Sequence, residues 1–260
     1  MKKLATALVS AAAIMTMSTT AFAAENPAEV FDRVMEKNNT IQSAEIQSGV
    51  HSVILAKDVI PDGQMKVDMA MHAEMDMQDT TDLKYLAQVA SSILGQDSYS
   101  QVFYTDGYYY VDANGVKLKY PMPLEQIISS VQTGVNTSNM ESSYMKGISL
   151  NEVNGKRVLA YEANPKKLNK NVKEALGTVM NTLGTDVNLD MNIQEMKGAY
   201  VLDDNDYIIY MTNYIVYNME VLDQPMTCIT LMETVVTLPS TDGYEDLIGL
   251  YDGVIESEVE

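Results

Sequence analysis

The sequence predicts an α+β fold in which helices pack on a curved antiparallel sheet, and three observations support this class. One is a long alternation of apolar and polar residues from Gln64 to Gln78, which has the period of a half-buried strand. Another is a set of three Asp-Gly or Asn-Gly pairs between β-type runs, which are strong hairpin signals because both turn residues need positive φ. The last is a group of segments with helical spacing and capping signals.

The alternating stretch has an apolar side made mostly of methionine. Its odd positions hold Met65, Val67, Met69, Met71, Ala73, Met75 and Met77. At ~3.3 Å per residue this run would reach roughly 43 Å, far beyond a usual strand, so we expect a strongly twisted or curled sheet. Flexible thioether side chains adapt to guests of different shape. The stretch therefore indicates either the wall of an apolar cavity or an ordinary packed core.

The N-terminal residues have the pattern of a signal peptide. Lys2 and Lys3 precede an apolar run, which ends before the small-residue site Ala21-Phe22-Ala23. We expect residues 1–23 to be removed before Ala24 and the chain to be secreted or extracytoplasmic in the cell envelope, with a retained membrane-anchoring helix as the alternative. Residues 24–260 are predicted to form a single domain, whose acidic tail, about 241–260, is only partly ordered.

The first half of the mature chain is predicted to alternate between helices and strands. Asn26 and Pro27 open a short amphipathic helix that ends near Asn38. A β-type run from Ala44 to Ala56 then forms a hairpin with the methionine strand. The period changes to helical between Thr80 and Gly95, so we expect a helix there. Three strands follow in a meander, Tyr99–Thr105, Tyr108–Asp112 and Val116–Tyr120.

The second half is predicted to contain two more helices and five more strands. The helices open at Pro123 and at Asn164-Pro165. The strands are Ile148–Glu152, Lys156–Ala163, Val187–Ile193, its continuation to Leu202 after a bulge near Glu195, Tyr207–Leu222 and Met226–Leu238. The last two have apolar residues on both faces, which is typical of covered strands.

Charge and cysteine content exclude several classes of partner. Without Lys2 and Lys3 the 17 basic residues fall to 15 against 36 acidic ones, a net charge of −21. Such a chain repels phosphate backbones and anionic lipid surfaces, so we expect no nucleic-acid partner. We also expect no stable membrane span after cleavage. A single cysteine, Cys228, excludes an internal disulfide, and its apolar neighbours predict a buried thiol.

No residue pattern indicates catalysis, a metal site or a cofactor. His51 and His72 lie on the polar faces of adjoining predicted strands, and we expect both to be solvent-exposed. Gly147–Asn151 lacks the final glycine of a nucleophile elbow. Asp186–Asp190 resembles the start of a calcium loop, but Met191 stands where that loop needs glycine. We therefore expect a protein that is not an enzyme.

The order of features resembles a known group of exported proteins. The chain combines a short N-terminal helix, Met-rich strands, the Tyr-Thr-Asp-Gly-Tyr-Tyr-Tyr hairpin at Tyr104–Tyr110 and Val-Lys-Leu-Lys-Tyr-Pro-Met-Pro-Leu at Val116–Leu124. These features resemble uncharacterised secreted proteins and lipoproteins of Gram-positive bacteria related to the LolA/LppX group. The resemblance implies a curved antiparallel half-barrel with helices packed on or across its concave face, around a cavity for lipid acyl chains. The lipobox cysteine of the lipoprotein members is missing.

The functional hypothesis is an exported, non-enzymatic binding protein that carries or senses a lipid or other apolar ligand. The expected cavity wall consists of Met65, Val67, Met69, Met71, Met75, Met191 and Ile193. The alternative is an envelope module with a filled core, which contacts a protein or a glycan through exposed tyrosines, Tyr108–Tyr110 and Tyr214.

Overall fold

A computed structural model describes residues 25–56, 60, 62–78, 83–124, 140–170, 191–221, 224–237 and 250. Its elements are α2 (Pro27–Asn38), the 3₁₀ turn η1 (Ser142–Tyr144) and the strands β1 (Ser43–Leu55), β2 (Gln64–Asp76), β3 (Lys84–Ile93), β4 (Gln96–Thr105), β5 (Tyr108–Ala113), β6 (Val116–Pro121), β7 (Met145–Val153), β8 (Lys156–Ala163), β9 (Met191–Leu202), β10 (Ile208–Val221) and β11 (Gln224–Thr237). Residues 165–170 are also helical.

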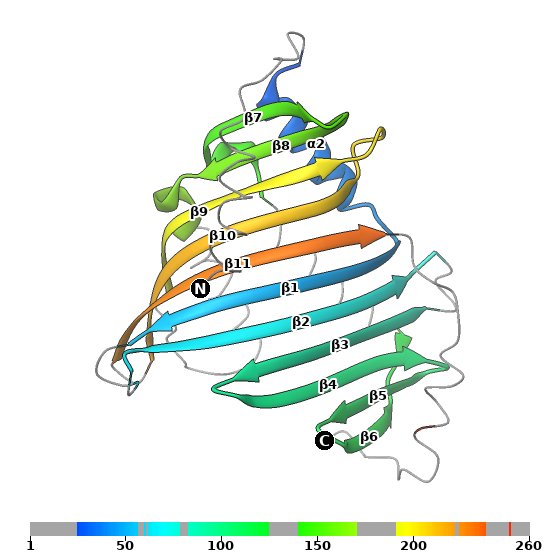
Figure 1. Ribbon diagram of the computed structural model, residues 1–260. Coiled ribbons are helices and arrows are strands. Elements are labelled where there is room, and N and C mark those ends of the chain that lie inside the picture. The colour runs from blue at the N-terminus through cyan, green and yellow to red at the C-terminus, as the bar shows by residue number, and fades with distance from the viewer. Residues whose placement is uncertain are drawn as a thin grey trace. The chain divides into compact units, whose positions relative to one another are not determined.

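The strands follow the order β6-β5-β4-β3-β2-β1-β11-β10-β9-β8-β7 (Figure 1). The chain divides into two compact units: unit 1 comprises Met1–Asn38, Val50–Val67 and Asn139–Glu233, and unit 2 comprises Asn39–Gly49, Asp68–Ser138 and Thr234–Glu260. β1, β2 and β11 contribute residues to both. The pairs β3–β4, β4–β5, β5–β6, β7–β8, β8–β9 and β9–β10 are all antiparallel.

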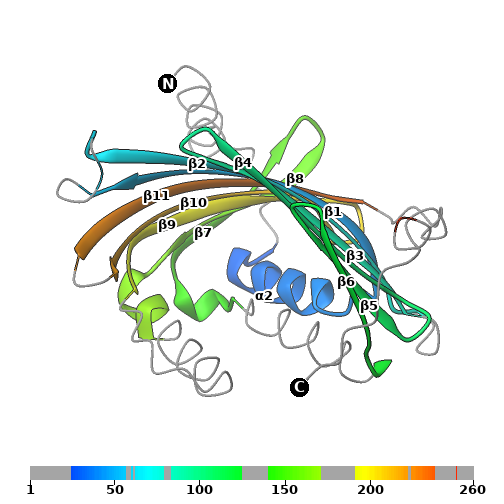
Figure 2. The ribbon, with the colours of Figure 1, turned by 90° about the horizontal axis from the view of Figure 1, so that it is seen from below.

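Unit 1 is built around α2, whose start follows from its sequence. Asn26 accepts a hydrogen bond from the Ala28 N–H at 3.1 Å, and Pro27 fixes φ at the first helical position. The apolar stripe Val30, Phe31 and Val34 is fully buried. In Figure 2 the strands β9 and β10 curve around α2, which lies on their concave side. The predicted α+β class, with a curved antiparallel sheet and a helix on its concave face, is confirmed.

The core of unit 1 joins α2 to strands β7 to β10. Its buried members are Val30, Phe31, Val34, Leu150, Leu159, Tyr161, Tyr200, Leu202 and Ile208. Phe31 packs edge-on against Tyr161, with ring centroids 5.8 Å apart. Complete burial of such a side chain contributes roughly 1.5–3 kcal/mol to folding. The neighbouring Gly198 has no room for a side chain, because an added Cβ would lie 2.5 Å from the Thr212 carbonyl oxygen.

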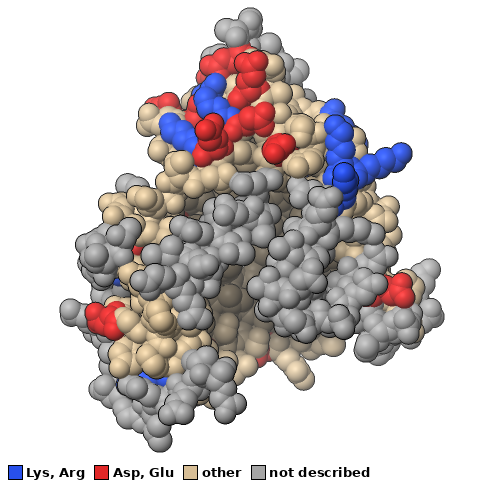
Figure 3. Space-filling view, turned by 180° about the vertical axis from the view of Figure 1, so that it is seen from behind, with Lys and Arg blue, Asp and Glu red and all other residues tan. Residues whose placement is uncertain are grey.

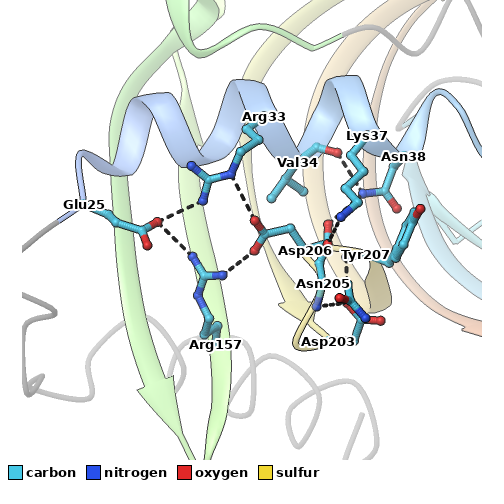
Figure 4. A network of polar contacts seen from close by, with 10 residues as sticks. All are labelled: Glu25, Arg33, Val34, Lys37, Asn38, Arg157, Asp203, Asn205, Asp206 and Tyr207. Carbon is cyan, nitrogen blue, oxygen red and sulfur yellow. Dashed lines mark hydrogen bonds and ion pairs between the residues drawn. The ribbon is translucent and has the colours of Figure 1, made fainter.

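A network of charged side chains links α2 to β8 and to the turn before β10 (Figure 4). The chain has two arginines, Arg33 and Arg157, and both contact Glu25 and Asp206. Arg33 lies 3.0 Å from the Asp206 carboxylate and 2.9 Å from Glu25, and Arg157 lies 3.1 Å from Glu25 and also pairs with Asp206. Hydrogen bonds to Glu25 and Asp206 raise the pKa of Arg33. Lys37 extends the network, since its ammonium donates to the Asn205 carbonyl.

Unit 2 contains the predicted meander, now with an additional strand. Asp106-Gly107 and Asn114-Gly115 have positive φ at both residues and connect β4, β5 and β6 as predicted. The helix predicted from Thr80 to Gly95 is wrong, because Lys84–Ile93 is the strand β3. β3 pairs with β4 from Tyr85 opposite Tyr104 to Ile93 opposite Gln96.

The error at β3 has a clear physical reason. Leu94 and Gly95 both have positive φ, 52° and 76°, and form a two-residue hairpin turn. Leucine rarely adopts this conformation, so Gly95 in the sequence indicates the end of a helix and not the second residue of a turn. Pairing with β4 then outweighed the helical spacing of the apolar residues.

Other predictions have mixed outcomes. The bulge near Glu195 is confirmed, because Val216 pairs with Glu195 while Tyr217 pairs with Ile193. Cys228 is buried as predicted. The signal peptide, the calcium-like segment Asp186–Asp190, the acidic tail and most of the two later helices lie outside the described residues. Among the residues that are described, no helix is long and apolar enough to cross a membrane.

Candidate apolar ligand site

The two faces of unit 2 can be told apart from one side-chain contact. His72 Nδ1 lies 3.3 Å from the Gln88 side-chain oxygen, so the even positions of β2 share a face with Gln88. Since side chains alternate along a strand, Met69, Met71 and Met75 lie on the opposite face. Met77 follows them and packs against buried Leu83 and Tyr104.

A row of tyrosines crosses the methionine face of unit 2. Tyr85, Tyr104, Tyr109 and Tyr120 lie directly opposite one another on β3, β4, β5 and β6. The rings of Tyr109 and Tyr120 are 5.4 Å apart. Burial, with smaller contributions from Tyr85 and Tyr120, raises the pKa of Tyr109 to about 12. Tyrosine provides apolar area together with a hydroxyl that can orient a ligand.

A pocket opens beside this row at Tyr104. Its volume is about 680 Å³, and it is lined by Leu83, Tyr104, Asp106, Gly107, Pro121, Met122, Pro123 and Leu124. Pockets for small molecules typically have volumes of about 300–1,000 Å³ and mostly apolar walls. Asp106 is the one ionisable carboxylate in this lining, and the Tyr104 hydroxyl is used by a 3.2 Å hydrogen bond to the Met122 carbonyl. The pocket therefore suits a ligand with a large apolar part.

The face around the pocket keeps apolar side chains exposed. Met69 is 37% exposed, Met71 39%, Leu118 42% and Val116 64%. The register through β3, β4, β5 and β6 places Val116 and Leu118 on the same face as the tyrosine row. Figure 3 shows charged side chains in a few separate clusters on a described surface that is otherwise mostly uncharged in that view. Exposed apolar side chains gathered on one face often mark a binding surface.

The seven residues expected from the sequence divide between the two units. Met69, Met71 and Met75 belong to unit 2 and share the face of the pocket. Met65, Val67, Met191 and Ile193 belong to unit 1, where Ile193 is buried in a cluster with Ala163 and Leu168. A single wall made of all seven remains a prediction.

The pocket residues themselves were missed by sequence analysis. Leu83 falls within the segment predicted to be a helix, Met122 precedes the helix predicted to open at Pro123, and Leu124 belongs to that helix. The tyrosine-rich run at Tyr104–Tyr110 was the sequence signal that could have pointed to the pocket. The hairpin turn at Asp106-Gly107 divides that run, and strand pairing places Tyr104 and Tyr109 on one face but Tyr110 on the other.

Two expectations about exposed side chains are wrong. His51 and His72 are both half-buried, and His72 lies among Glu45, Glu74 and Gln88. Tyr110, expected to be exposed, is buried and stacks on Phe103 with ring centroids 4.4 Å apart. Tyr108, Tyr109 and Tyr214 are half-buried.

Comparisons with known proteins give a family and several distant structures. The model described as "Family of unknown function (DUF6612)" matches residues 26–240. A comparison with curated proteins found no match. Solved structures similar to this chain include LprF from Mycobacterium bovis (9% identity, 84% of this chain and 97% of that chain covered, TM-score 0.32) and the lipoprotein LppX from Mycobacterium tuberculosis (8%, 79% and 94%, TM-score 0.32). A DUF1329 family protein from Desulfovibrio piger is also similar (10%, 84% and 96%, TM-score 0.25).

Proposed function

This chain belongs to the DUF6612 family of unknown function, and we propose that it is a non-enzymatic binding protein for a lipid or another apolar ligand. The observation that carries the proposal is the pocket of about 680 Å³ on the methionine face of unit 2. Its lining offers apolar walls with a single carboxylate, so binding would gain mainly from removing apolar surface from water.

The surroundings of the pocket support a ligand longer than the pocket itself. Exposed Met69 and Met71 continue the same apolar face, and their thioether side chains can adjust to alkyl chains of different length or branching. Asp106 would repel an anionic head group placed next to it. The ligand would therefore insert its apolar end and keep any acidic group away from Asp106.

The predicted signal peptide supports a role outside the cytoplasm. Together with the apolar site it gives the finer proposal of an exported carrier or sensor in the cell envelope. An envelope protein partner is the second candidate, because β6 ends the strand order and exposes Val116 and Leu118. An edge strand of this kind can take up a partner strand.

The test measures binding of a fluorescent fatty-acyl probe to tag-free protein. Leu124→Glu places a carboxylate in the pocket lining and should weaken probe binding at least about tenfold, which corresponds to roughly 1.4 kcal/mol. The matched control is Val235→Glu, which adds the same charge at an exposed position outside the lining. Equal affinity of wild type and both variants, or no probe binding by the wild type, would reject the proposal.

Native mass spectrometry of gently purified protein separates the two candidates. A co-purified mass of lipid size supports the carrier. A bare chain mass, together with no probe binding, favours the envelope interaction module.

A further inference from the structure

Three potential metal ligands meet on the other face of unit 2, away from the methionine face. The Met77 N–H donates to the Gln42 carbonyl at 2.7 Å, and this register puts Glu45 of β1 opposite Glu74 of β2. His72 lies two residues before Glu74 and so shares its face. His72 Nε2 is 3.2 Å from Glu45 Oε1 and 3.2 Å from Glu74 Oε1. All three ligand atoms lie within 4.8 Å of one another.

His72 Nε2 is buried and has no hydrogen-bond partner. The other ring nitrogen, Nδ1, faces the Gln88 side-chain oxygen, which can only accept, so Nδ1 carries the proton. In the neutral ring, Nε2 then points its lone pair at two carboxylates. A lone pair that faces two carboxylates is repulsive, and either a proton on Nε2 or a metal cation between the three groups would remove the repulsion.

The distances between the ligand atoms suit a bound metal ion. Zinc binds histidine nitrogen and carboxylate oxygen at about 2.0–2.2 Å, which separates two ligand atoms by roughly 3.0–3.4 Å for bond angles between 90° and the tetrahedral value. The two separations from Nε2, 3.2 Å each, fall in this range, and the two carboxylate oxygens lie within 4.8 Å of each other. His72 Nε2 also lies within ion-pair distance of both carboxylates, so a proton on the ring and a metal ion would compete for the same position.

A chain of hydrogen bonds holds the histidine ring in place. The Gln88 amide donates to Gln101 Oε1 at 2.7 Å, and the Tyr99 hydroxyl donates to the same oxygen at 2.9 Å. Gln101 is buried. Such outer contacts fix the tautomer and the orientation of a metal-binding histidine.

The two carboxylates have different surroundings. Burial raises the pKa of Glu74, and the charge of Glu45 raises it further while His72 opposes the shift. The pKa of Glu45 is lowered, first by its hydrogen bond from Gln47 at 2.7 Å. A cation between the two carboxylates would offset their mutual repulsion.

We propose that Glu45, His72 and Glu74 bind a divalent transition-metal ion, for which Zn²⁺ is the best chemical match. One imidazole and two carboxylates are ligands that zinc accepts, whereas Ca²⁺ and Mg²⁺ prefer oxygen alone. Three protein ligands leave a fourth tetrahedral position for water or for a donor from a partner. The sequence analysis expected no metal site, because the three residues are separated by up to 29 positions and only strand pairing unites them.

Isothermal titration calorimetry with ZnCl₂ on chelator-treated, tag-free full-length protein tests the proposal. We expect one Zn²⁺ per chain and at least tenfold weaker binding of Ca²⁺ and Mg²⁺. His72→Ala and the nearly isosteric Glu74→Gln should each abolish saturable binding. Gln88→Leu should weaken it about ten- to a hundredfold, because the ring loses its orienting partner.

Two matched controls locate the site. His51→Ala removes the other histidine, and Glu152→Gln removes an exposed strand carboxylate in unit 1; both should bind Zn²⁺ as the wild type does. Circular dichroism checks that every variant is folded. Absence of Zn²⁺ binding by the wild type, retention of binding by folded Glu74→Gln, or equal loss in His51→Ala would each overturn the proposal.

Discussion

The apolar face of unit 1 is closed to solvent, whereas the apolar face of unit 2 is partly exposed. In unit 1 the stripe of α2 is fully buried against β7 to β10, and Phe31 has no exposed surface. In unit 2 the methionine face keeps Met69 and Met71 more than a third exposed and borders a pocket. Both faces arise from amphipathic elements of ordinary pattern. The difference shows that amphipathic patterning provides an apolar face, whereas a packed partner decides whether that face becomes a core or a surface for a ligand.

The largest effect is expected from truncation in the closed core. Phe31→Ala removes a ring that contacts Tyr161 and Tyr200, and the cavity it leaves should lower the free energy of unfolding by about 3–5 kcal/mol. Urea denaturation measures this change. A loss below about 1 kcal/mol would show that α2 is not tightly packed and would remove the contrast between the units.

The arginine network should contribute less than the core. Asp206→Asn keeps a residue that tolerates the positive φ of 67° at this position but takes the shared carboxylate from Arg33 and Arg157. We expect a loss of about 1.5–3 kcal/mol, the range for hydrogen bonds to charged groups. Glu25→Gln is the control at the exposed end of the network and should cost less than about 1 kcal/mol. A larger loss of unfolding free energy for Glu25→Gln than for Asp206→Asn, measured by urea denaturation, would contradict this network.

Truncation on the open face of unit 2 should cost little stability. Met69 already lacks protein neighbours on part of its surface, so Met69→Ala removes fewer contacts than a core truncation does. We expect it to lower the free energy of unfolding of the ligand-free protein by under about 2 kcal/mol, while changing the affinity for a fluorescent fatty-acyl probe. A loss as large as that of Phe31→Ala, without probe binding by the wild type, would mean that the methionine face is a filled core.

The smallest effect concerns stability at alkaline pH. In the folded state the pKa of Tyr109 is raised to about 12 from the ordinary 10.0, so folding favours the protonated phenol. This contribution is fully present below pH 10 and is lost as the pH rises from 10 towards 12. Tyr109→Phe should therefore make the fall in unfolding free energy over this range shallower.

The same alkaline effect is expected in unit 1. Burial raises the pKa of Tyr200 in unit 1 to about 12 as well, so Tyr200→Phe should act in the same direction. Phenolate absorbance of each variant against the wild type should show that both tyrosines ionise well above pH 10. Ionisation of Tyr109 near pH 10 would argue that the tyrosine row of unit 2 is more open than the core of unit 1.

The sequence by itself determined the elements whose signals are local. Asn26 and Pro27 set the start of α2, and the Asn-Gly and Asp-Gly pairs set three hairpins, because capping and positive φ depend on residues only a few positions apart. The alternation from Gln64 to Gln78 likewise determined β2. These features need no knowledge of the rest of the chain.

Only the tertiary structure decided β3 and the two candidate sites. The apolar residues between Leu83 and Leu94 have helical spacing, and pairing with β4 nevertheless made Lys84–Ile93 a strand. Strand register brought Leu83 near Met122 in the pocket, and it placed Glu45 opposite Glu74. Register is set by contacts between strands far apart in sequence, and a shift of one residue would move every side chain to the other face.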